Sequence, residues 1–159
     1  MRSVIVNTSP LIVLNDLGKL DLLEKLYGQV IIPHAVYEEL TAKSSEHHIS
    51  FGAFPWINVT EIQNELAKKF FETQLHAGEV EVMILAKELN ADLIIIDDAN
   101  AKKHAKRLGI TTTGTLGVLI KAKNEGFIDK LQPLIEEMQL NGFYISESIV
   151  DICLRLAGE

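Results

Sequence analysis

A run of four apolar residues, Leu93 to Ile96, constrains the fold more than any other stretch of the sequence. Because this run has no polar face, it indicates a strand covered on both sides, as in a parallel sheet packed between helices. Two adjacent aspartates, Asp97 and Asp98, follow it directly. Either the chain simply reaches the surface there, or the two negative charges hold a ligand.

Short apolar runs alternate with helical stretches along the rest of the chain. The sequence predicts further strands at 3–6, 29–33, 56–62 and 110–113. It predicts helices at 9–18, 21–28, 33–43, 63–74, 77–90, just after residue 98, at 115–126 and over most of 129–159. Ser9 and Thr115 are the expected helix caps, and residues 44–55 lack periodicity and are predicted to be a loop. Strands separated by helices favour an α/β fold with a parallel sheet, and the absence of a linker favours a single domain, residues 1–159.

Composition excludes several classes of protein. The 159 residues suit one domain with its own core, and no apolar run approaches the ~18 residues of a membrane span. The apolar N-terminal stretch is broken by polar residues 7–9 and Pro10, unlike a secretory signal. A single cysteine, Cys153, excludes an internal disulfide and a cysteine metal cluster, so we expect a cytoplasmic protein. The net charge of −7 argues against binding nucleic acid by overall charge, but not against a local basic patch.

Polar side chains follow two of the predicted strands at the point where each strand ends. Asp97 and Asp98 follow one strand, and Asn7 follows the first. Ligands of open parallel sheets bind outside the carboxyl ends of the strands. We therefore expect one rim that carries two acids and an amide.

Helical wheels select two glutamates that would join this rim. Glu79 falls on the apolar side of its helix, whereas Glu81 falls on the other side, beside Glu88. In the preceding helix Glu39 lies next to the apolar face and Glu38 lies nearly opposite. Two plainer interpretations stay open: Glu79 stabilises the start of its helix, and Glu39 packs its stem at the edge of the core.

A divalent cation would explain a cluster of Glu39, Glu79, Asp97 and Asp98. Clustered carboxylates repel one another, and a buried charge without compensation is costly. Oxygen ligands without cysteine suit Mg²⁺ or Mn²⁺. Such ions usually act on phosphate substrates, where they polarise the phosphoryl oxygens and activate water.

Five segments together resemble PIN-domain proteins, and most of all the DUF3368 branch, whose members are described as predicted nucleic-acid-binding proteins. They cover nearly the whole chain and read VNTSPLIVL, IIPHAVYEEL, LHAGEVEVMILAKEL, LIIIDDANAKKHAKRLGI and TTGTLGVLIKAKNEGFI. The resemblance implies a three-layer α/β/α fold with a central parallel sheet. It also implies an Mg²⁺- or Mn²⁺-dependent ribonuclease, which in many relatives is the toxin of a toxin–antitoxin pair.

The resemblance assigns catalytic and metal-binding positions. The first acid of the family falls on Asn7, the second on Glu39, the third on Glu79 and the fourth on Asp97, with Asp98 as an additional ligand. An amide matches a carboxylate in shape and can bind a metal through its oxygen, but it lacks the charge. Asn7 therefore keeps an alternative open, a weak or inactive PIN module that binds RNA or a partner protein.

A basic face follows the acids. Lys102 and Lys106, and likewise Lys103 and Arg107, are i,i+4 pairs on the helix after Asp98. The face is either merely solvated or a track for the phosphates of single-stranded RNA. Ser9 would add a hydroxyl to RNA binding if it does not serve as a helix cap.

Three further interpretations complete the sequence analysis. The loop residues His47, His48, Phe51, Phe54 and Trp56 either stack on RNA bases or pack locally, and the two histidines lack an obvious third ligand for zinc. The apolar C-terminal stretch 148–158 belongs either to the core or to the surface of a homodimer. A phosphoacceptor receiver domain is disfavoured, because that fold places an acid pair at the first strand, which here ends in an asparagine.

Overall fold

The computed structural model describes residues 2–43, 45–71 and 75–159. Its centre is a five-stranded sheet in the order β3-β2-β1-β4-β5, in which all neighbouring strands run parallel. The strands are β1 (Val4–Val6), β2 (Val30–Pro33), β3 (Ile57–Thr60), β4 (Leu93–Ile95) and β5 (Thr112–Thr113). The predicted strands and the parallel sheet are confirmed.

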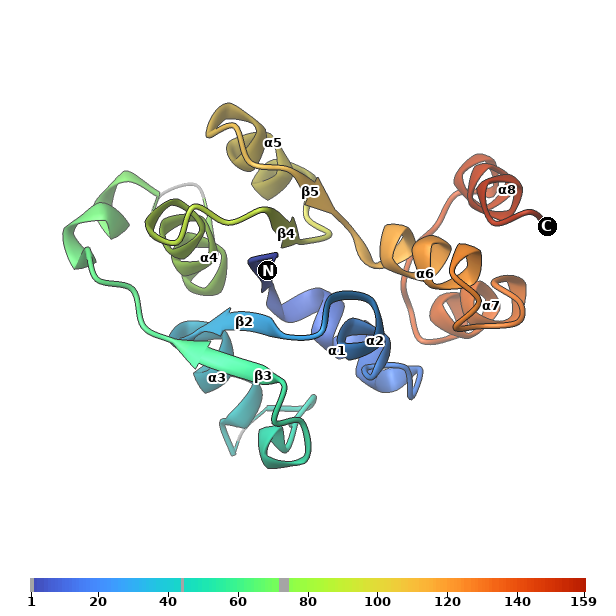
Figure 1. The fold of residues 1–159 in the computed structure, drawn as a ribbon, viewed down its shortest axis with the longest axis horizontal. Helices are drawn as coiled ribbons and strands as arrows, with labels where there is room; N and C mark the ends of the chain where they lie inside the picture. Colours follow the sequence, from blue (N-terminus) through green and yellow to red (C-terminus); the bar gives the residue numbers. More distant parts are fainter. Residues whose placement is uncertain (1, 44, 72–74) are drawn as a thin grey trace.

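Helices cover both faces of the sheet and give the expected three-layer α/β/α arrangement (Figure 1). One side carries α4 (Ala77–Glu88) and α5 (Ala99–Arg107). The other side carries α1 (Thr8–Asp16), α2 (Leu22–Tyr27), α3 (His34–Thr41), α6 (Thr115–Asn124), α7 (Gln132–Leu140) and α8 (Glu147–Leu156). Within the described ranges, no helix has the length and apolar character that crossing a membrane requires.

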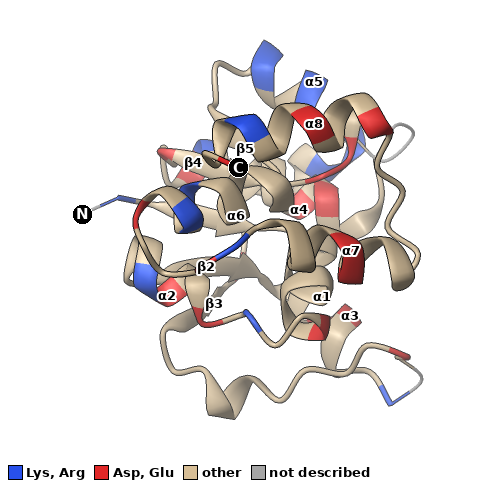
Figure 2. Cartoon of the chain, turned by 90° about the vertical axis from the view of Figure 1, so that its right-hand side faces the viewer, with Lys and Arg blue, Asp and Glu red and all other residues tan. Residues whose placement is uncertain are grey.

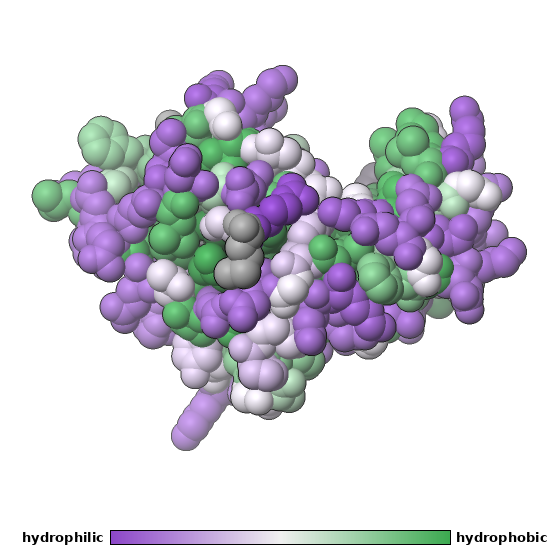
Figure 3. Space-filling model, in the orientation of Figure 1, coloured by the Kyte–Doolittle hydropathy of each residue, from purple (hydrophilic) through white to green (hydrophobic). Residues whose placement is uncertain are grey.

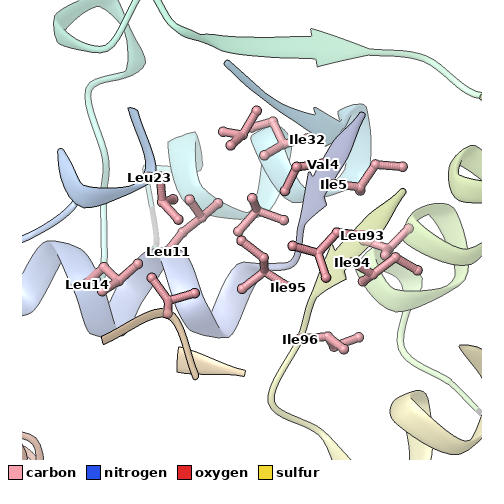
Figure 4. Packing of buried hydrophobic residues seen from close by; sticks show 14 of the residues in the cluster. Val4, Ile5, Leu11, Leu14, Leu23, Ile32, Leu93, Ile94, Ile95 and Ile96 are labelled. Carbon is pink, nitrogen blue, oxygen red and sulfur yellow. The ribbon is translucent and has the colours of Figure 1, made fainter. Parts of the chain in front are cut away.

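The core forms because the central strands have no polar face. Every residue of β1 and β4 is buried, and Ile5 of β1 pairs with Ile31 on one side and Ile94 on the other. Side chains from these strands pack against Leu11 and Leu14 of α1 (Figure 4). Burial on both faces accounts for the unbroken apolar runs in the sequence.

Two predicted segments differ from the observed elements. Instead of an α-helix over 63–74, the chain forms a 3₁₀ helix, η2 (Glu65–Phe70), and residues 72–74 lie outside the described part. The predicted loop 44–55 contains a short 3₁₀ turn, η1 (Phe51–Ala53). Short 3₁₀ pieces are common as connectors, and neither segment has an apolar face long enough to support a full α-helix.

Both predicted caps are displaced by one or two positions. The cap of α1 is Asn7 rather than Ser9, and the cap of α6 is Gly114 rather than Thr115. In both cases the strand passes into the helix almost without a linker: β1 ends at Val6 and α1 begins at Thr8. The cap position therefore falls on the single residue at the strand end, and that residue lies at the rim where ligands of parallel sheets bind.

Candidate functional site

A pocket of about 260 Å³ opens at the carboxyl edge of the sheet. It lies where β1 passes into α1, beside α3 and the first turn of α4. Its lining includes four of the side chains selected from the sequence, together with four others: Asn7, Thr8, Ser9, Ile12, Glu39, His76, Gly78 and Glu79. The fold thus brings together three chain segments that are far apart in the sequence.

Asn7 is fixed at the floor of this pocket. It is only 5% exposed, and its backbone N–H donates to the carbonyl of Ile95 at 3.0 Å, which ties the end of β1 to β4. Its side-chain Oδ1 and the Oγ1 of Thr8 are buried without a hydrogen-bond partner among the described residues. A Cβ added to Gly78 would lie 3.8 Å and 3.5 Å from these two atoms. Because unsatisfied buried polar atoms are costly, this pair beside Gly78 is a natural place for a ligand.

Glu79 faces the pocket from the first turn of α4. It is 7% exposed, and its Oε1 accepts a hydrogen bond of 3.1 Å from the backbone N–H of His76, the residue that caps the helix. The predicted burial of Glu79 is confirmed. The stabilisation of the helix start is also present, and it occupies only part of the acceptor capacity of the carboxylate.

The two glutamates of α3 are both exposed to solvent, unlike the inward placement expected for Glu39, and they differ in what they contact. Glu39 is exposed and lines the pocket, so it reaches the site from its solvent side. Glu38 is exposed away from the pocket lining, and its Oε1 lies 2.7 Å from Nε2 of His34. Only Glu39 is therefore placed to share a ligand with Glu79.

Asp97 holds the start of α6. Its Oδ1 accepts from the backbone N–H of Thr115 at 2.7 Å, and its Oδ2 accepts from the hydroxyl of the same residue at 2.7 Å. The Ser9 hydroxyl adds a longer bond to Oδ2 at 3.4 Å. A Cβ on Gly114 would lie only 2.8 Å from Oδ1, so this close approach requires glycine. Since a carboxylate has about four lone-pair sites, Asp97 keeps roughly one for a water or a cation.

Asp98 also holds a helix N-terminus. It is the cap of α5, where its Oδ1 accepts from the backbone N–H of Ala101 at 3.0 Å, and it is exposed. The buried strand therefore ends in two aspartates at a point where two helix N-termini meet. Carboxylates are favoured there by the unpaired N–H groups and by the helix dipole.

The acids do not form a compact cluster. Among the described residues, no group of three or more His, Cys, Asp or Glu side chains lies close enough together to hold a metal. The pocket instead offers the carboxylates of Glu39 and Glu79 and the free amide oxygen of Asn7. All three are hard oxygen donors, and Mg²⁺ is commonly held by one or two carboxylates, with waters and substrate phosphates completing its shell. The residues present therefore fit such an ion.

The predicted basic face lies beside these acids. Lys103, Lys106 and Arg107 are exposed on α5, whereas Lys102 is half-buried, with Nζ 3.2 Å from the position that a Cβ of Gly114 would take. Figure 2 shows the basic residues of α5 at the top of the molecule, and Figure 3 shows hydrophilic side chains over the same helix. Lys102 therefore connects the basic face to the surroundings of Asp97.

The aromatic loop packs against the protein. The ring of Phe51 lies 5.5 Å from that of Tyr37, and the ring of Phe54 lies 5.9 Å from that of Trp56. All of these aromatic residues contact the hydrophobic core, and Nδ1 of His47 lies 3.9 Å from Asp16. The geometry favours local packing over base stacking.

Sequence reasoning missed two polar residues of the pocket and misplaced one residue nearby. His76 and Thr8 line the pocket, and their positions at helix starts were the available signal. The expectation that Glu81 lies on a polar side of α4 is wrong: it is 8% exposed. The wheel describes one helix alone, whereas Glu81 is covered by α3 and η2, with which it makes a hydrogen bond and an ion pair.

Replacing Thr115 with valine tests the anchoring of Asp97. Valine keeps the shape but removes the hydroxyl that donates to Oδ2. We expect the free energy of unfolding to fall by about 1.5 kcal/mol or more, because the lost bond is to a charged group. Guanidinium unfolding measures this value, with Thr41→Val as the control, since that hydroxyl donates to the neutral carbonyl of Tyr37 and not to a carboxylate. A smaller loss at Thr115 than at Thr41 would contradict the assignment.

Comparison with known proteins agrees with this architecture. The profile of the DUF3368 family, described as PIN domain, matches residues 3–159, a range that includes every strand and every pocket residue. No curated protein matches the chain. PIN domains are connected with nuclease activity, nucleic-acid binding and divalent metals. The chain therefore belongs to the DUF3368 family of PIN domains.

Proposed function

We propose that this protein is a divalent-metal-dependent ribonuclease of PIN type, a single domain that uses Mg²⁺ or Mn²⁺, and that it is the toxin of a toxin–antitoxin pair. The observation that carries the proposal is the pocket at the strand ends, where two carboxylates and an unpartnered amide oxygen meet. The basic helix α5 begins at the same edge of the sheet. An acidic pocket beside a basic face suits a phosphodiester substrate and the cation that accompanies it.

Different residues would bind the cation, orient the water and bind the RNA in this reaction. Glu39, Glu79 and Asn7 would hold the cation, which when bound supplies positive charge for the phosphoryl oxygens and a more acidic attacking water. Asp97, anchored by Thr115, has acceptor capacity left to orient a water. Lys102 lies beside Asp97 and Gly114, where its ammonium group would bind a phosphate oxygen of the RNA near the acids. The exposed Lys103, Lys106 and Arg107 would follow the RNA backbone.

One observation favours a second function, a PIN module that binds RNA or a partner protein without cleaving it. Asn7 places a neutral amide where the family pattern has an acid, and the described residues hold no group of three acids or histidines close enough for a metal. A pocket with less negative charge binds a cation less tightly. In this case RNA binding by α5 would persist without metal-dependent cleavage.

Two further partners stay predictions: a small antitoxin protein and a second copy of this chain. α8 exposes an apolar stripe of Ile149, Ile152 and Leu156. Figure 3 shows hydrophobic surface over this helix. Stripes of this kind are common in interfaces between proteins.

Cleavage of single-stranded RNA in Mn²⁺ and in chelator distinguishes the two functions. We expect Mn²⁺-dependent cleavage by the native protein and a loss of roughly 100-fold or more in Glu79→Gln, because the cation contributes several kcal/mol of charge stabilisation. Calorimetric titration with Mn²⁺ should weaken in parallel. Glu38→Gln, on the same rim but outside the pocket lining, is the control. RNA binding without cleavage in any metal would favour the binding module.

The Asn7→Asp variant tests the role of the amide. Asparagine and aspartate have the same shape, so the change adds a negative charge beside Glu79 without repacking. Without metal we expect lower stability from charge repulsion. With Mn²⁺ we expect binding about tenfold tighter, equal to about 1.4 kcal/mol, and a larger rise in melting temperature on adding metal. Unchanged Mn²⁺ affinity would show that Asn7 does not contribute to the metal site.

The double variant Lys103→Ala/Lys106→Ala tests the phosphate track. We expect weaker binding to every single-stranded RNA and a salt dependence flatter by about 0.7 per lost phosphate contact. Fluorescence anisotropy at several salt concentrations measures both. Lys130→Ala, which removes an exposed lysine before α7, should leave both values unchanged. If the double variant behaves like this control, the basic face is merely solvated.

A further inference from the structure

Glu81 is a buried carboxylate for which the proposed reaction has no use. Its Oε1 accepts a hydrogen bond of 3.0 Å from the backbone N–H of Ala35, and its Oε2 lies 3.2 Å from Nζ of Lys68. Lys68 also contacts Oε2 of Glu65 at 2.9 Å. Through this one side chain α4 is connected to both α3 and η2.

The contacts compensate the cost of burying the charge. A buried carboxylate is expensive unless it is hydrogen-bonded and paired. The N–H of Ala35 belongs to the first turn of α3, where backbone donors are unpaired and the dipole favours an anion. Hydrogen bonds to Glu65 and then to Glu81 raise the pKa of Lys68 above its ordinary value, which keeps this lysine charged. Glu81 is therefore held from two sides in one position.

The Ala35–Glu81 contact joins the two helices that carry the glutamates of the pocket. Glu79 precedes Glu81 by two residues on α4, and Glu39 follows Ala35 by four residues, about one turn, on α3. The bond from Ala35 to Glu81 thus joins the first turn of α3 to the beginning of the second turn of α4. The two helix starts meet at the carboxyl edge of the sheet, where β2 passes into α3.

We propose that Glu81 is a positioning residue that fixes the separation between Glu39 and Glu79, and so sets the affinity of the pocket for a divalent cation. This inference rests on the proposed metal site. Glu81 itself does not line that pocket. Residues that orient metal ligands in this way affect binding of the metal without touching it.

The test compares Glu81→Ala with Glu88→Ala. Glu88 is a matched control on the same helix: its carboxylate accepts backbone N–H bonds from Gln63 and Asn64 at 2.8 Å to 3.1 Å, away from the pocket. Both variants should lower the melting temperature. Only Glu81→Ala should weaken Mn²⁺ binding, by about 10-fold or more, and speed hydrogen exchange at the amide of Ala35.

Two conservative variants separate positioning from charge. Glu81→Gln keeps an acceptor for the amide of Ala35. This variant should retain the native Mn²⁺ affinity, and hydrogen exchange at that amide should remain slow. Glu81→Asp keeps the charge but is one methylene too short to reach Ala35, so it should behave like Glu81→Ala; it also serves if the alanine variant fails to fold. Equal Mn²⁺ affinity in the native protein, Glu81→Asp and Glu88→Ala overturns the inference. A native protein that binds no Mn²⁺ overturns the proposed function instead, and exchange at Ala35 still decides whether Glu81 holds α3.

Discussion

Hydrogen bonds between carboxylates and helix N-termini organise the carboxyl edge of the sheet. A helix begins with N–H groups that have no partner in the helix, and a parallel α/β fold brings several such beginnings to one edge. Four acids there accept from the first turn of a helix or from its cap. The pairs are Asp97 with α6, Asp98 with α5, Glu81 with α3, and Glu79 with the cap of its own helix.

This interaction changes how an acidic rim should be interpreted. Carboxylates near one another repel, yet helix dipoles and N–H donors offset that repulsion without any cation. Acidity alone therefore does not identify a metal site. What separates a structural acid from one that can bind a ligand is the acceptor capacity that remains and the direction the carboxylate faces. Asp98 caps a helix at the surface. Glu79 uses one oxygen to accept from the cap residue and lines the pocket.

The sequence was informative where one element determines the outcome. Unbroken apolar runs predicted the strands, and the periodicity of α4 predicted that Glu79 is buried. The same wheel failed for Glu81, because the groups that cover it come from α3, 46 residues away, and from η2. The prediction that Ser9 caps α1 was wrong for a related reason, because the cap is Asn7. A strand that passes directly into a helix places the cap at the strand end, which propensity alone does not reveal.

Asn7 has a consequence for how a substrate and a cation would occupy the site. Its buried oxygen lacks a partner in the described structure and contributes no charge, so Glu39 and Glu79 supply the negative charge of the pocket. In the proposed nuclease the phosphate of the RNA would then complete the ligand shell. By thermodynamic linkage, each of two ligands that share a shell strengthens the binding of the other to the same degree. In the proposed nuclease a neutral amide at this position would therefore make cation binding depend on the presence of RNA.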